Sequence, residues 1–288
     1  MVITFFKVIH FLCLSTITNL EIMQKTIHKR IPVWQFENFL EFSSVLHYIS
    51  GREGGVSDRY FDSLNLSFSV SDDSENVGEN RQRLANELQI NPNKFLFPWQ
   101  THSDNIKIIL NPEGKRDNLA NTDGIITNVP GICISVLTAD CVPLIFYDPS
   151  KQVIGAVHSG WRGTVKGIAG KMVQTFITEF NSKPSDILVG IGPSIGPDVY
   201  EVGKDVVEEV KKTFGKESEL ILNEKKNKKA YLNLWKANRI LLEHKRIPPE
   251  NIEKAYICTY TDHEYFFSAR RLGKDCGRFG AGIMLKRQ

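Results

Sequence analysis

Residues 142–157 of this chain have the sequence VPLIFYDPSKQVIGAV, which predicts a β-hairpin. Two apolar runs, Val142–Tyr147 and Gln152–Val157, have the length and composition of buried strands. Between them, Asp148–Lys151 carries the Asp-Pro-Ser sequence that is typical of a turn. If the turn is centred on the middle of this segment, the numbers of paired residues sum to 299.

This pairing brings a cysteine and a histidine together at the open end of the hairpin. Cys141 and His158 also sum to 299, and directly opposed residues have Cβ atoms roughly 4.5–5.5 Å apart on one face of the sheet. His102, in the segment QTHS, is a second imidazole at the edge of an apolar run. Two imidazoles and one thiol form a zinc ligand set with a fourth position open. Taken singly, each of the three has an ordinary alternative as a buried or surface side chain.

The rest of the chain alternates between helical and strand patterns. Helical periodicity is present in Asn80–Leu88, Thr164–Phe180, Lys204–Phe214 and Leu232–His244, and strands are predicted at 132–137, 187–191, 256–260 and 265–268. Short turns join several neighbouring strands, so we expect mixed sheets covered by helices. The pattern indicates one layered α/β or α+β domain.

The first 22 residues do not fit this domain. The stretch from Met1 to Ile17 is apolar but is interrupted by Lys7 and His10, so it is too short and too broken for a transmembrane helix. It also lacks the basic region and the cleavage site of a signal peptide. We expect residues 1–22 to be a mis-assigned start or a disordered extension, with a signal peptide or a genuine structural element as alternatives. The single folded domain would then occupy residues 23–288.

Composition narrows the class of protein. The chain has 36 Lys and Arg against 33 Asp and Glu, a formal charge of +3 that is dispersed and does not indicate a nucleic-acid surface. Its five cysteines include no CxxC pair, and an odd, irregular set argues for a reducing compartment. We therefore expect a cytoplasmic protein, monomeric, with neither nucleic acid nor a membrane as its partner.

Several motifs occur in a fixed order: QTHS, TADCVPLIF, AVHSGWRGTVKGI, VGIGPSIGPDVYEVG, ICTYTD, and FFSARR followed by DCGRFG. With these motifs the chain resembles the YfiH-like family, which is often labelled polyphenol oxidase or laccase domain and whose members are regarded as purine nucleoside phosphorylases. The resemblance runs from about Asn65 to the C-terminus. It implies a four-layer α/β/β/α sandwich of mixed sheets, related to the cysteine hydrolases of the cytotoxic-necrotizing-factor type.

The resemblance also implies the residues of the site. The family's metal ligands match His102, Cys141 and His158, which would also be the catalytic residues. Positions near the family's pocket match five residues that would bind substrate or phosphate: Asn65, Arg81, Arg162, Arg270 and Arg271. The segment Ser268–Arg271 departs from the family's frequent Ser-Tyr-Arg-Arg, because Ala269 replaces the tyrosine.

The implied activity is zinc-dependent phosphorolysis. Adenosine, inosine and methylthioadenosine would react with phosphate to give the free base and ribose 1-phosphate or methylthioribose 1-phosphate, and adenosine would also be deaminated. Bidentate arginine suits a phosphate better than lysine does. Copper is possible at an N/S site, so copper-dependent polyphenol oxidation is possible as a side activity. A true multicopper laccase is not indicated, because the chain has seven histidines and no His-x-His pair.

Two other classes remain open on the sequence. In a metal-free amide hydrolase, Cys141 would be the nucleophile and His158 its base, with His102 or Asp140 orienting the imidazole. Asp140 could alternatively orient a metal ligand, transfer a proton or cap the strand end. A non-catalytic binding protein would leave the open metal position and the arginines unexplained.

Overall fold

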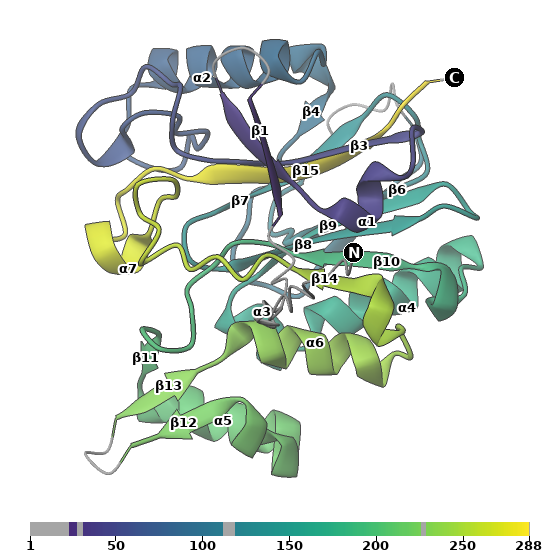
Figure 1. Cartoon of the computed structure of the whole chain (residues 1–288), viewed down its shortest axis with the longest axis vertical. Helices are drawn as coiled ribbons and strands as arrows, with labels where there is room; N and C mark the ends of the chain where they lie inside the picture. The colour runs from purple at the N-terminus through teal and green to yellow at the C-terminus, as the bar shows by residue number, and fades with distance from the viewer. Residues whose placement is uncertain (1–22, 28–30, 112–118, 226–228, 288) are drawn as a thin grey trace, which may run out of the picture.

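The computed structural model describes residues 23–27, 31–111, 119–225 and 229–287. The predicted extension at residues 1–22 lies outside these ranges. The described chain builds two six-stranded mixed sheets, one three-stranded sheet and a set of helices (Figure 1). Among the described residues, no helix is both long enough and apolar enough to cross a membrane.

The first sheet contains strands from both ends of the described chain. Its order is β1 (Gln24–Ile27), β2 (Pro32–Gln35), β3 (Val45–Ser50), β15 (Phe279–Leu285), β7 (Cys133–Thr138) and β4 (Phe95–Leu96). All pairs are antiparallel except β4 with β7. The short strand β4 therefore lies at one edge of this sheet and leads directly into the segment that carries His102.

The second sheet is built around the predicted hairpin. Its order is β14 (Ile252–Lys254), β10 (Leu188–Ile191), β8 (Val142–Asp148), β9 (Val153–Ser159), β6 (Gly124–Thr127) and β5 (Ile106–Ile109). The pairs β10–β14 and β5–β6 are parallel and the others are antiparallel. Every residue of β8 and β9 is buried, as the continuous apolar runs predict for strands covered on both faces.

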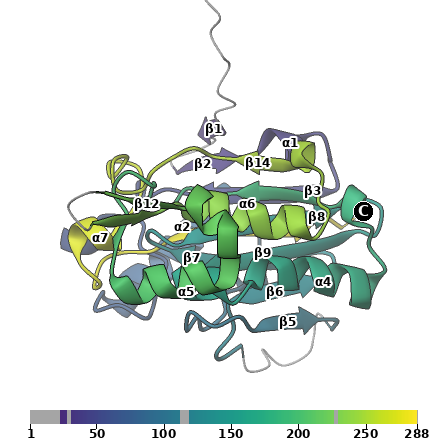
Figure 2. The same cartoon turned by 90° about the horizontal axis from the view of Figure 1, so that it is seen from below.

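The two sheets pack face to face, and helices cover their outer faces (Figures 1 and 2). The helices are α1 (Glu37–Leu40), α2 (Ser74–Glu87), α3 (Trp161–Val165), α4 (Ile168–Phe180), α5 (Lys204–Phe214), α6 (Leu234–His244) and α7 (Ala269–Leu272). The small sheet, of order β11 (Glu201–Val202), β13 (Ala230–Leu232) and β12 (Leu222–Glu224), lies beside α5 in Figure 1.

Three apolar clusters fill the spaces between these layers. Tyr48 of β3 packs with Leu84 of α2 on the outer face of the first sheet. Ile134 of β7 and Ile154 of β9 belong to the cluster between the sheets. The third cluster joins the outer face of the second sheet to α4 and α6, and Gly155 allows a close approach there, because a Cβ would lie 3.1 Å from Met172 Sδ. The layers confirm the predicted four-layer α/β/β/α arrangement of mixed sheets.

The register of the hairpin differs from the prediction. Pro143 pairs with His158 and Asp148 pairs with Val153, so the numbers of paired residues sum to 301 rather than 299. The turn keeps the predicted length of four residues but lies one residue later, at 149–152, where the Asp148 carboxylate accepts hydrogen bonds from the backbone N–H groups of Ser150 and Lys151. Cys141 and His158 are therefore not directly opposed.

The prediction of two strands near the C-terminus, at 256–260 and 265–268, is also wrong. Residues 252–254 form β14, whereas residues 256–260 and 265–268 form turns and irregular backbone with one isolated bridge between Ser194 and Cys258. Two stable turns account for this: the backbone N–H groups of Asp262 and Phe266 donate to the carbonyls of Cys258 and Asp262. The apolar side chains Phe266 and Phe267 are still buried, in the core between the two sheets.

Candidate metal centre and pocket

The three predicted ligands come together in space. His102 lies on the loop between β4 and β5, Cys141 directly precedes β8, and His158 is near the end of β9. One ligand atom from each side chain lies within 4.8 Å of the other two, and the imidazole rings are 5.0 Å apart in an edge-to-face arrangement. Within the described ranges, this is the single group of three or more His, Cys, Asp or Glu side chains that could hold a metal ion.

The actual register still brings Cys141 and His158 together. A sum of 301 places Cys141 across from Gly160 and diagonally across from His158. Diagonal neighbours two residues apart stay on the same face of a sheet, and longer side chains bridge the distance between them. Because the sum of paired residue numbers was wrong by two, Cys141 and His158 still lie on the same face of the sheet. They are therefore close to each other, although they are not directly opposed as predicted.

Gly160 leaves the space between the donor atoms open. A Cβ at this position would lie 2.9 Å from Cys141 Sγ, closer than real Cβ contacts, and 3.0 Å from His102 Cδ2. The donors are one sulfur and two ring nitrogens, the set that suits a tetrahedral zinc with one open position. The residues present therefore fit a zinc ion, both in chemistry and in the room left for it.

Asp123 orients both histidines. Its Oδ1 lies 2.8 Å from His158 Nδ1 and accepts the backbone N–H of His102 at 3.1 Å, while Oδ2 accepts the backbone N–H groups of Thr101 and Ser103. This arrangement holds His102 at a φ of 59°, a left-handed conformation that is uncommon for a non-glycine residue. The bond to Nδ1 leaves His158 Nε2 to face the cluster, the usual arrangement of a carboxylate behind a ligating histidine.

Asp140 does not have this role. Its two carboxylate oxygens accept hydrogen bonds from the Thr259 hydroxyl at 2.7 Å and from the Arg270 backbone N–H at 2.6 Å. Asp140 therefore ties the end of β7 to the 259–270 segment, and the orienting carboxylate comes from the Asn121–Gly124 turn instead. Nothing in the sequence pattern linked Asp123 to His158, which lies 35 residues further along the chain.

The electrostatics of the cluster favour an ionised thiol. Burial raises the pKa of Cys141, but the charge of His158 and hydrogen bonds from both imidazoles outweigh it and lower the pKa to about 6. Burial lowers the pKa of His158, and the Cys141 thiolate and the Asp123 carboxylate raise it to about 9. Without a metal, the two groups form a thiolate–imidazolium pair, and a thiolate is the form that binds metal or attacks as a nucleophile.

The cluster opens into a pocket of about 670 Å³, a size typical of small-molecule sites. Two of the predicted arginines line it. Arg162 extends from α3 with its guanidinium 4.4 Å from the Trp161 ring, and Arg270 donates from Nη1 to the Glu201 carbonyl at 2.9 Å. The Arg270 guanidinium also lies 5.1 Å from the Tyr200 ring.

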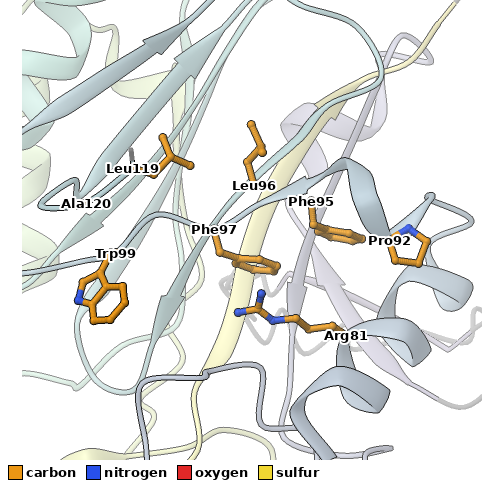
Figure 3. Close-up of a pocket in the computed structure, with 8 residues that line it drawn as sticks. All are labelled: Arg81, Pro92, Phe95, Leu96, Phe97, Trp99, Leu119 and Ala120. Carbon is orange, nitrogen blue, oxygen red and sulfur yellow. The ribbon is translucent and has the colours of Figure 1, made fainter. Parts of the chain in front are cut away.

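The other predicted substrate residues lie outside this lining. Asn65 is buried and bonds to Asp72, to Ser67 and to the backbone N–H of Arg278, so it shapes the loop beside the pocket. Arg271 lies over the Tyr260 ring. Arg81 lines a separate pocket at the edge of β4 (Figure 3). The motif match placed these side chains near the site without fixing where they point.

Sequence reasoning missed four further residues of the pocket: Gln100, Tyr200, Lys274 and Arg278. Burial raises the pKa of the Tyr200 phenol, so Tyr200 stays protonated and is a hydrogen-bond donor in the pocket. Gln100 bonds through its amide to both backbone groups of Leu137 and holds the His102 loop against β7. Gln100, Tyr200 and Arg278 lie in the quoted motifs, and this was the available signal for them.

Comparison with known proteins identifies relatives of this architecture. Residues 46–286 match the family described as multi-copper polyphenol oxidoreductase laccase. A purine nucleoside phosphorylase of Bacteroides thetaiotaomicron is 34% identical over 256 residues, covering 87% of this chain and 95% of the relative. An adenosine deaminase from an unknown prokaryotic organism is also 34% identical, covering 85% and 93%.

A solved structure agrees with the fold. The crystal structure of the hypothetical protein YfiH from Bacillus licheniformis superposes with a TM-score of 0.85 and 32% identity, covering 91% of this chain and 99% of that one. The family match spans most of the chain and the fold is shared. The chain therefore belongs to the YfiH-like family, the family described as multi-copper polyphenol oxidoreductase laccase.

Proposed function

We propose that this chain is a zinc-dependent purine nucleoside phosphorylase, with His102, Cys141 and His158 as the metal ligands. The observation that carries the proposal is the convergence of these three donors, within 4.8 Å, in the wall of a pocket that two arginines also line. The names of the relatives support this activity, because they include a purine nucleoside phosphorylase and an adenosine deaminase of similar length.

The ligands would leave one zinc position open toward the pocket. A bound zinc would supply Lewis acidity there. The protein's own groups supply the rest: Asp123 fixes the orientation of His158, and Gly160 keeps the space between the donors clear. Copper is a second possible occupant of this N/S set, with polyphenol oxidation as a possible side activity.

The arginines give the pocket its anion-binding capacity. The Arg270 guanidinium lies 5.1 Å from the Tyr200 ring, and the charges of Arg270 and Arg162 both lower the pKa of this phenol, against the larger effect of burial. A phosphate held by one or both would receive hydrogen bonds from a planar guanidinium fork. The protonated Tyr200 hydroxyl could donate a further hydrogen bond to a nucleoside in the same pocket. Inosine, adenosine and methylthioadenosine are the substrates we propose, with deamination of adenosine as a second reaction.

A product assay tests the proposal. Purified protein is incubated with inosine, adenosine or methylthioadenosine, with and without phosphate, and the products are identified by mass spectrometry. We expect phosphate-dependent release of base and formation of the corresponding sugar 1-phosphate. Arg162→Lys keeps the charge but loses the fork, so its rate should fall at least about tenfold. Release of free ribose at the same rate without phosphate would identify a hydrolase instead.

One observation favours a second candidate, the metal-free amide hydrolase. Cys141, His158 and Asp123 are arranged as nucleophile, base and orienting carboxylate, with 2.8 Å between His158 Nδ1 and Asp123 Oδ1. Metal content decides between the two candidates. Full activity on an amide substrate in protein stripped of metal would favour the hydrolase, whereas activity that requires zinc would favour the phosphorylase.

A further inference from the structure

A second pocket lies beside the metal pocket, at the edge of the first sheet (Figure 3). Its volume is about 350 Å³, within the range of small-molecule sites. Strand β4 and the segment that follows it supply four of its eight lining residues, and Arg81 of helix α2 is the one charged residue among the eight. The proposed phosphorylase activity makes no use of this pocket.

The extended segment after β4 separates the two pockets. Phe97 and Trp99 line the second pocket, whereas Pro98 and Gln100 line the metal pocket. This alternation follows from extended backbone, in which successive side chains point to opposite sides. A ligand in the second pocket would therefore contact different side chains from a ligand at the metal.

The wall of the second pocket offers aromatic surface to solvent. The Trp99 side chain is 69% exposed, a large value for an indole that borders a cavity. The Phe97 ring is stacked on Phe95, with centroids 5.7 Å apart and planes within 5°, so it is held in place. In Figure 3 the rings of Phe97 and Trp99 point to the same side of the segment, the side on which Arg81 lies. The exposed Trp99 indole suits a planar aromatic ligand, because stacking tolerates many ring chemistries.

Arg81 adds a positive charge to this surface. Its guanidinium carbon lies 4.2 Å from the Phe97 centroid and 4.5 Å from the Phe68 centroid, so the two rings cover its faces. Nε donates to the Leu66 carbonyl at 2.8 Å, which fixes the plane of the group. A guanidinium oriented in this way is suited to a phosphate or carboxylate group.

We propose that this second pocket binds a planar aromatic ring that carries an anionic group, with the dimensions of a mononucleotide. The ring stacks against the exposed Trp99, and the anion pairs with Arg81. The site is independent of the metal, so it exists whether or not the chain is a phosphorylase.

Tryptophan fluorescence tests this site directly. Of the four tryptophans, Trp34 and Trp235 are buried and Trp161 lines the metal pocket. In a Trp161→Phe protein, quenching by adenosine 5′-monophosphate therefore reports on Trp99. We expect saturable quenching by the monophosphate, with adenosine at least about tenfold weaker because it lacks the charge-assisted hydrogen bonds. The same result is expected when Cys141→Ser is added, which separates this site from the proposed metal chemistry.

Variants of α2 supply the controls. Arg81→Met should abolish the preference for the monophosphate, and Arg81→Lys, the milder change, should reduce it. Arg83→Met is the matched control, since Arg83 lies on the same helix but pairs with Glu79 at the surface, and it should keep the preference. The absence of quenching at millimolar monophosphate, equal affinity for adenosine, or a preference unaffected by both Arg81 variants would each overturn the proposal.

Discussion

Replacement of Asp123 by asparagine should weaken zinc binding without removing a ligand. The carboxylate accepts five hydrogen bonds: from His158 Nδ1, from the backbone N–H groups of Thr101, His102 and Ser103, and from the Ser103 hydroxyl. An asparagine that keeps its oxygen toward the two histidines directs its NH₂ group at the N–H groups of Thr101 and Ser103, where donors would face donors. Both ligand histidines then lose part of their support.

The size of the effect follows from the position of Asp123 behind the ligands. Loss of a carboxylate that orients ligating histidines typically costs 10–100-fold in metal affinity. We therefore expect Asp123→Asn to raise the zinc Kd by about 10–100-fold, or about 1.4–2.7 kcal/mol. Competition with a chromophoric chelator measures this Kd, and thermal melts of the metal-free proteins show whether the variant is still folded.

Asp140→Asn is the matched control, because Asp140 lines the same pocket but bonds to Thr259 and Arg270 rather than to a histidine. We expect its zinc Kd to stay within about threefold of the unmodified protein, since no ligand contact changes. A folded Asp123→Asn protein with unchanged zinc affinity would refute this account of the site. If only Asp140→Asn lost zinc affinity, Asp140 rather than Asp123 would be the carboxylate that orients the ligands.

Three further predictions concern the metal, the pH dependence and the N-terminus. The purified protein should carry about one zinc per chain, and Cys141→Ser should lose most of it while the melting temperature of the metal-free protein changes little; elemental analysis decides this, and undiminished zinc in the variant would contradict it. His47 accepts a hydrogen bond from the Phe36 N–H, and burial lowers its pKa to about 3. The imidazole is therefore protonated at a lower pH in the folded state than in the unfolded state, so the folded state loses stability as the pH falls below 6.5. Between pH 7 and 5 the free energy of unfolding should fall by about 2 kcal/mol because of His47. Urea unfolding at the two pH values should show this decrease in the unmodified protein and a smaller one in His47→Gln. A chain that begins at Met23 should keep the activity and melting temperature of the full chain, since ends with few buried contacts tolerate removal; a drop of several degrees would mean that residues 2–20 pack against the domain.

The sequence by itself determined the elements whose signal is local. Continuous apolar runs around an Asp-Pro-Ser turn specified the hairpin β8–β9, because a strand buried on both faces needs apolar residues at every position. Helical periodicity likewise specified α4, α5 and α6 to within a few residues. The motif order pointed to the four-layer fold and to the three candidate ligands, which the structure brings together.

Only the tertiary structure decided how distant segments meet. The first sheet joins strands from residues 24–50 to β15 near the C-terminus, and no local pattern encodes such pairing. The hairpin register depended on the position of the turn, which keeps four residues but lies one residue later than predicted, at 149–152, and so raises the sum of paired residue numbers by two. Asp123 became the partner of His158, and Arg81 turned toward a separate pocket, because hydrogen bonds and ring contacts form between groups that are far apart in sequence. Periodicity reports which face of an element is buried, whereas the partner of a polar side chain is set by the packing of whole layers.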